Sequence, residues 1–194
     1  MLKTLTTVAS VALPIEERWS IKRCRYAPDG SSAGRVCIAT GTHGDEMMGQ
    51  LIIYLVQQRI GEHPDALRGT VDFYPMLNPL GLDIGERLVP SGTRLDMNRA
   101  FPGSPNGTPL EYMCHQVIQD MRGADLVLDL HASARNKSEL YEVRVSAKEA
   151  ERLLPRVRAL CPQLIWVYPD KGSFSASLTG ALGAVGRYLM GFVP

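Results

Sequence analysis

The chain has 194 residues, enough for one full hydrophobic core, and we expect a single domain over residues 1–194. Lysine plus arginine number 21 against 20 acidic residues, so no overall electric field favours nucleic acid or an anionic membrane. The four cysteines are scattered and suggest no disulfide framework, which indicates a cytoplasmic protein. The apolar, glycine-rich end of the chain contains Arg187 and small polar residues, so a membrane span is not expected there.

Strands and helices are expected to alternate along the chain. The hydrophobic patterns predict strands at 3–11, 18–26, 35–40, 71–76, 125–130, 140–146 and 164–168, and helices at 45–60, 109–121, 147–160 and about 174–186. Residues 78–108 are rich in Gly, Pro, Asn and Arg and are expected to form a long loop, which is commonly functional. This order predicts an α/β fold with three layers, α/β/α, around a mostly parallel, mixed central sheet.

A glycine-rich turn, Thr40-Gly41-Thr42-His43-Gly44-Asp45-Glu46, joins the third predicted strand to the first predicted helix. His43 and Glu46 are three residues apart, so at the start of a helix both side chains would lie on one face. An imidazole and a carboxylate in that arrangement can bind one divalent ion. The pattern is short, and a capping His43 with a solvated Glu46 is the ordinary alternative.

A third ligand is offered by His131, which ends the predicted strand at 125–130. The carboxyl ends of strands are the edge of an α/β sheet where ligands collect. With His43 and Glu46 it would complete two histidines and one glutamate with an open position, as in catalytic zinc sites. The alternative is a hydrogen-bonded histidine of the core. Asp45 and Asp129 are expected to orient the imidazoles.

The long loop contains candidate substrate-binding residues. Arg99 can bind a carboxylate through two parallel hydrogen bonds, and the adjacent Asn98 adds a donor. Asp96 is expected to restrain Arg99. Arg87 and Arg94 bring more positive charge into the loop, where one of them could face an oxyanion near the metal. The alternative for each arginine is a solvated surface charge.

The segments GTHGDE, NPLG, DMNRAFPG and DLH follow one another in this order, and VYPDKGSFSASLTGALG comes after them. Together they resemble the succinylglutamate desuccinylase/aspartoacylase family, which belongs to the wider zinc-carboxypeptidase fold. The resemblance runs from about residue 35 to the end of the chain. It implies a zinc-dependent amidohydrolase that removes an N-acyl group from an amino acid or a similar small amine by means of metal-activated water.

The resemblance also implies roles for matched residues. It makes Zn²⁺ the cofactor and assigns its ligands as His43, Glu46 and His131. It implies that Asn98 and Arg99 bind the carboxylate of the substrate. Arg87 is our first candidate for polarising the scissile carbonyl, and Arg94 is the second.

One part of the family pattern is missing. The family supplies its general base as a glutamate on a strand expected near residue 187, whereas the last glutamate here is Glu151. We therefore expect a truncated enzyme that lacks its C-terminal part and a second, β-rich domain. We expect such a chain to have weak or no activity, because the general base is missing. We also expect it to keep an uncovered sheet edge, which promotes self-association.

Three functions stay open on the sequence. The first is the zinc deacylase, whose partner is a small N-acyl amino acid and for which a homo-oligomer is a candidate assembly. The second is a remnant that binds zinc and small carboxylates without catalysis. The third is a metallocarboxypeptidase acting on peptides, which would use the same ligands and the same carboxylate clamp.

Overall fold

The computed structural model describes residues 1–90, 95–133, 140–169, 175–183 and 188–193. Eight strands form one sheet in the order β1-β2-β4-β3-β5-β8-β6-β7. The strands are β1 (Leu2–Ala12), β2 (Arg18–Ala27), β3 (Arg35–Thr40), β4 (Thr70–Tyr74), β5 (Leu126–Ala132), β6 (Glu142–Ser146), β7 (Leu164–Tyr168) and β8 (Tyr188–Val193). The helices are α1 (Met48–Glu62), α2 (Pro79–Ile84), α3 (Pro109–Met121), α4 (Ala150–Ala159) and α5 (Leu178–Gly183), with short 3-10 turns η1 (Pro14–Glu16), η2 (Pro64–Ala66) and η3 (Met97–Arg99).

The sheet is mixed, as predicted. Strand β3 runs parallel to both of its neighbours, β4 and β5, and the pairs β5–β8 and β6–β7 are also parallel. The pairs β1–β2, β2–β4 and β6–β8 are antiparallel. The parallel centre of the sheet therefore contains the strands β3 and β5, which are expected from the sequence to lead to the candidate metal ligands.

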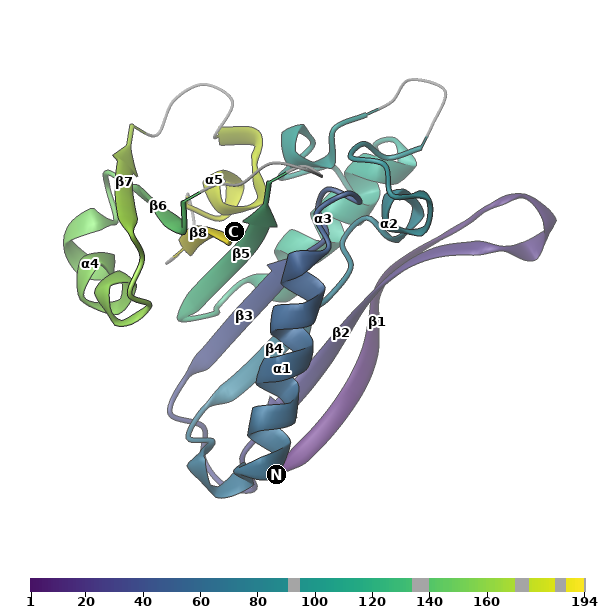
Figure 1. Ribbon diagram of the computed structural model, residues 1–194. Helices are drawn as coiled ribbons and strands as arrows, with labels where there is room; N and C mark the ends of the chain where they lie inside the picture. Colours follow the sequence, from purple (N-terminus) through teal and green to yellow (C-terminus); the bar gives the residue numbers. More distant parts are fainter. Residues whose placement is uncertain (91–94, 134–139, 170–174, 184–187, 194) are drawn as a thin grey trace.

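Helices cover both faces of the sheet (Figure 1), which gives the predicted three layers. Successive residues of a strand point to opposite faces, and β5 shows the division. Val127 packs in the cluster that includes α3 and α5, whereas Leu128 packs towards α4 and Leu130 towards α1. Helices α1 and α4 thus lie on one face, and α3 and α5 lie on the other.

Helix α3 begins where its local sequence dictates. Thr108 and Glu111 form a capping box, in which each side chain accepts a hydrogen bond from the other residue's backbone N–H, and Pro109 occupies the first turn. The helix then buries one apolar face against the sheet.

Several expected boundaries change. Helix α1 begins at Met48 rather than at residue 45. Helix α5 covers Leu178–Gly183, and residues 174 and 184–186 of the expected helix lie outside the described residues. The expected loop at 78–108 contains α2 and η3. In α2, the Asn78 side chain accepts a hydrogen bond from the N–H of Gly81, and Pro79 pre-sets the first turn. A short polar cap of this kind can start a helix within a segment whose composition otherwise resembles that of a loop.

The expectation that the sheet keeps an uncovered edge, because no strand follows the last helix, is wrong. Strand β8 lies inside the sheet, where it pairs with β5 on one side and with β6 on the other. Because it is hydrogen-bonded along both sides, β8 closes the sheet between β5 and β6 instead of leaving an edge. Within the described residues, no helix is both long enough and apolar enough to cross a membrane.

Candidate metal centre

The first two candidate ligands lie in the turn between β3 and α1, not in the helix. The N–H of Glu46 donates to the carbonyl oxygen of His43 at 3.3 Å, which folds the two side chains back to one side. Gly44 fits this turn closely against α2, since a Cβ at Gly44 would lie 2.1 Å from the backbone of Gly81. The predicted proximity of His43 and Glu46 is therefore confirmed, but a tight turn produces it.

The third candidate ligand comes from the neighbouring parallel strand. In the register of β3 and β5, Thr40 lies opposite Leu130, so the residues that follow them meet at one edge of the sheet. His131 is the next residue of β5 after Leu130. The His131 side chain points to the same face of the sheet as Val127, which is the face opposite α1.

The three side chains converge on a single point. Nδ1 of His43 lies 2.7 Å from Oε1 of Glu46, Nδ1 of His131 lies 3.0 Å from Oε2 of Glu46, and the two Nδ1 atoms are 3.2 Å apart. All three side chains are buried, with exposed fractions of 2–3%. One ligand atom from each residue falls within 4.8 Å of the others.

The far side of each imidazole contacts a carboxylate. Nε2 of His43 lies 3.3 Å from Oδ1 of Asp96, and Nε2 of His131 lies 3.1 Å from Oδ2 of Asp129. An ionised carboxylate only accepts, so Nε2 of each ring donates the hydrogen bond. In the neutral imidazoles, the Nδ1 lone pairs then face each other and the oxygens of Glu46. A cluster of acceptors at these distances fits a cation, and this pattern of outer carboxylates is typical of metal-bound histidines.

Without a metal, the same cluster attracts a proton. Burial lowers the pKa of His131, but the charges and hydrogen bonds of Asp129 and Glu46 outweigh burial and raise it to about 10. Burial raises the pKa of Glu46, but hydrogen bonds to His131 and His43 hold it well below its usual range. The site therefore favours an ionised glutamate beside positive charge.

Two further donors hold Glu46. Arg87 donates from Nη1 to Oε1 at 2.8 Å, and the N–H of Ala132 donates to Oε2 at 2.9 Å. The Arg87 side chain is 45% exposed, so its guanidinium reaches the buried cluster from the solvent side. The sequence predicts Arg87 near the metal, but its contact with the candidate ligand Glu46 was not predicted.

The segment around η3 lies beside this centre. Asp96 accepts from the N–H of Asn98 at 2.8 Å as well as from His43. Arg99 is exposed and donates from Nη1 to the carbonyl oxygen of Asn98 at 2.7 Å, while Asn98 is buried. The side-chain oxygen of Asn98 is buried and has no hydrogen-bond partner among the described residues. Arg94, the remaining candidate, lies outside the described residues.

The expected role of Asp96 changes accordingly. Its hydrogen bonds within the described part of the chain go to His43 and Asn98, whereas Arg99 acts on it through charge. Burial raises the pKa of Asp96, but the hydrogen bond and charge of His43, together with Asn98 and Arg99, outweigh burial and lower it. Asp96 therefore orients an imidazole, the role expected of Asp45.

The expectation for the other two aspartates is half confirmed. Asp129 contacts His131 as predicted. Oδ1 of Asp45 is buried without a hydrogen-bond partner in the described part of the chain. Asp45 is therefore not seen to orient either ring through that oxygen.

Comparison with known proteins agrees with this geometry. Residues 32–186 match the family described as succinylglutamate desuccinylase/aspartoacylase catalytic domain. The chain belongs to this family. It is also 33% identical over 98 residues to N-alpha-acetyl-L-2,4-diaminobutyric acid deacetylase from Halomonas elongata, and the match covers 49% of this chain and 27% of that protein.

Solved structures share the fold. The succinylglutamate desuccinylase/aspartoacylase from Rhodobacter sphaeroides has a TM-score of 0.79 at 21% identity, over 98% of this chain and 58% of that one. A metallo-carboxypeptidase from Burkholderia cenocepacia has a TM-score of 0.77 at 15% identity, over 99% of this chain and 55% of that one. The α/β, carboxypeptidase-like fold class is thus confirmed, and the chain spans a little over half the length of these proteins.

Proposed function

We propose that this protein is a zinc-dependent amidohydrolase that removes an N-acyl group from an acylated amino acid or a similar small amine. One observation carries the proposal. The ligand atoms of His43, Glu46 and His131 converge within 4.8 Å in a buried cluster, and the outer carboxylates orient both Nδ1 atoms towards Glu46, where a cation would contact all three side chains. Membership of a family of deacylases supports the reaction class.

Two histidines and one glutamate suit Zn²⁺, which takes nitrogen and oxygen ligands and keeps an open position in catalytic sites. When bound, zinc would lower the pKa of a water molecule and polarise the amide carbonyl. The chain's own residues would orient the metal ligands and bind the substrate. Asp96 and Asp129 hold the two rings in the orientation that presents Nδ1.

Substrate recognition would fall to the exposed arginines and Asn98. Arg87 already reaches the buried centre from solvent, so it is well placed to donate a hydrogen bond to a carbonyl oxygen that gains negative charge. Asn98 and Arg99 would bind the substrate carboxylate, with Arg94 as a further candidate. The side-chain oxygen of Asn98, which has no hydrogen-bond partner among the described residues, could accept from an N–H of the substrate.

The partial match to a deacetylase suggests the first substrates to test. That relative's name specifies an N-acetylated diamino acid. N-acetyl and N-succinyl amino acids, with and without a side-chain amine, therefore form the first panel. The likeness to a metallo-carboxypeptidase makes peptides with a free carboxyl end the matched alternative panel.

The test is release of free amine by the zinc-loaded protein, with His131→Ala as the inactive control. Turnover of N-acyl amino acids that His131→Ala abolishes supports the proposal. Cleavage of peptides alone would replace it with the carboxypeptidase alternative. Stoichiometric zinc binding without turnover of either panel would favour the non-catalytic alternative and overturn the proposal. If turnover is found, Asp45→Asn then tests whether the adjacent carboxylate serves as general base.

A further inference from the structure

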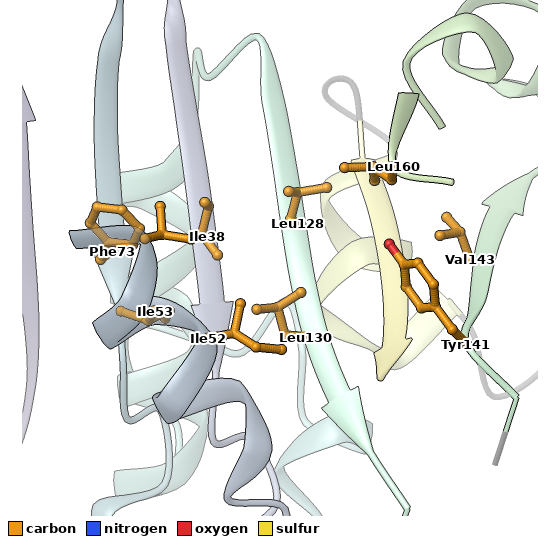
Figure 2. Close-up of a pocket in the computed structure, with 10 residues that line it drawn as sticks. Ile38, Ile52, Ile53, Phe73, Leu128, Leu130, Tyr141, Val143 and Leu160 are labelled. Carbon is orange, nitrogen blue, oxygen red and sulfur yellow. The ribbon is translucent and has the colours of Figure 1, made fainter. Parts of the chain in front are cut away.

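An apolar groove opens on the face of the sheet that carries α1 and α4, opposite the face towards which His131 points. Figure 2 shows Ile52 of α1 on one side, Leu128 and Leu130 of β5 along the floor, and Leu160 at the end of α4. The cavity has a volume of about 280 Å³, and none of the ten residues that line it is charged. A parallel sheet is normally covered on both faces, so this stretch of the face lacks a partner within the described chain.

A second apolar feature runs beside the groove along α1. Five large side chains, each 41–56% exposed, define what we call the α1 ridge: Met47, Met48, Leu51, Tyr54 and Leu55. Their spacing of three and four residues places them in one stripe on the helix. The sequence contains no charged residue from Met47 to Gln58. The first charges of α1 are Arg59 and Glu62, which pair with each other at 3.3 Å at the far end of the helix.

The α1 ridge projects beside the groove on the same face of the molecule. Two copies of this face can therefore pack together, with the ridge of each copy in the groove of the other. In a two-fold interface the same patch meets itself, so a charge near the axis would face an identical charge. The ridge and the lining of the groove carry none. We propose that this face is the interface between two copies of this chain, with the α1 ridge of each copy packed into the groove of the other.

The partner copy is favoured over another occupant because the ridge and the groove supply both halves of the contact. The rival occupant is a different stretch of polypeptide, such as the additional chain that the longer solved relatives possess. That rival would fill the groove without requiring a second copy. Measuring the oligomeric state therefore distinguishes a partner copy from this rival occupant.

The experiment is sedimentation equilibrium of the full chain across the micromolar range. We expect the mass to rise from the monomer value of 21.3 kDa to twice that value. Leu55→Glu should weaken association about tenfold or more, because it would place an unpaired charge in an apolar groove. The matched control is Leu5→Glu on β1, a leucine 69% exposed and outside the ridge, which should leave association unchanged.

The groove is tested by its own variant. Leu160 lines the groove and is 39% exposed, so Leu160→Lys should fold and should also weaken association. A mixture of Leu55→Glu with Leu160→Lys should associate more tightly than either variant alone, because the glutamate of one copy meets the lysine of the other. A monomeric wild-type protein, or a dimer that Leu55→Glu leaves intact, would overturn the proposal.

Discussion

At the scale of single residues, the chemistry of the centre depends on which atoms point inwards. His43 and His131 contact Glu46 through Nδ1, and aspartates occupy both Nε2 positions. These aspartates fix the ring orientations and strengthen the imidazoles as ligands. The centre can therefore be tested at its ligands and at the carboxylates behind them.

Removing a ligand should remove the metal. We expect about one zinc ion per chain in the wild-type protein, and its loss in both His43→Ala and His131→Ala, because two remaining ligands bind weakly. Elemental analysis of desalted protein measures this. His63→Ala removes an exposed histidine beyond α1 and should keep the metal. Equal metal content in all four proteins would disprove the ligand assignment.

Removing an orienting carboxylate should weaken the site without abolishing it. Asp96→Ala frees the His43 ring from its contact at Nε2, and zinc affinity should fall about 10- to 100-fold. Competition with a chelator of known affinity gives the dissociation constant. Asp65→Ala, at an exposed aspartate in η2, is the control. Unchanged affinity in Asp96→Ala would mean that other contacts suffice to orient the ring.

The proposed carboxylate clamp of Asn98 and Arg99 predicts a change in KM. A lysine cannot reproduce the planar fork of Arg99, and hydrogen bonds to charged groups contribute about 1.5–3 kcal/mol. Arg99→Lys should therefore raise KM for free-acid substrates roughly tenfold or more and should barely affect amide-capped ones. Arg158→Lys in α4 is the control, since Arg158 is exposed and lies in a different element. Equal use of free and capped substrates by the wild type would rule the clamp out.

At the scale of elements, the centre depends on how closely α1 approaches β3. Gly49 is buried in the first turn of α1 and lies against Thr40, the last residue of β3. A Cβ at Gly49 would come within 1.8 Å of the Thr40 hydroxyl oxygen and 2.7 Å of its Cβ. The turn that holds His43 and Glu46 connects these two contact points, so their spacing sets its shape.

Gly49→Ala should consequently destabilise the protein. The new methyl group forces α1 away from β3, and overpacking of this kind costs about 1–3 kcal/mol of unfolding free energy. Urea denaturation measures the loss, and zinc affinity should fall with it. Gly61→Ala is the matched control in the same helix, because nothing lies within 4 Å of its Cβ. This control should be neutral or stabilising by up to about 1 kcal/mol; similar destabilisation of both variants would contradict the packing explanation.

At the scale of the whole molecule, a buried carboxylate joins several elements. Asp72 of β4 is fully buried and accepts hydrogen bonds from Arg25 of β2 at 2.7 and 2.8 Å and from Arg35 of β3 at 2.6 Å. Asp120 of α3 extends the network through Arg23, at 2.7 Å. Burial raises the pKa of Asp72, but the hydrogen bonds from Arg25 and Arg35 outweigh burial and lower it.

This network predicts the direction of acid sensitivity. A carboxyl group whose pKa is lowered by folding contributes stability above its unfolded value, near 3.8, and that contribution is lost as pH falls through the folded value. Asp72→Asn should lower the unfolding free energy by roughly 2–3 kcal/mol at neutral pH. The variant should also lose less stability than the wild type below about pH 4. Urea denaturation at several pH values tests this, with Asp65→Asn as control; identical pH dependence in Asp72→Asn and wild type would contradict it.

The sequence by itself determined the α/β class, the alternating order of strands and helices, and three residues that meet at one centre. These features follow from local patterns: apolar periodicity, a glycine turn between His43 and Glu46, and a histidine at the end of a buried strand. Parallel strands bring their carboxyl ends to one edge, so the convergence of His131 with that turn could also be inferred.

Tertiary structure alone decided the partners of these residues. Asp96 meets His43 across 53 positions of the chain, and Arg87 meets Glu46 across 41. Strand β8 inserts between β5 and β6, and its pairing gives the sheet a continuity that was not predicted. Local periodicity constrains residues three or four apart, whereas contacts of this range depend on strand register and on how closely helices pack, which no short stretch of sequence encodes.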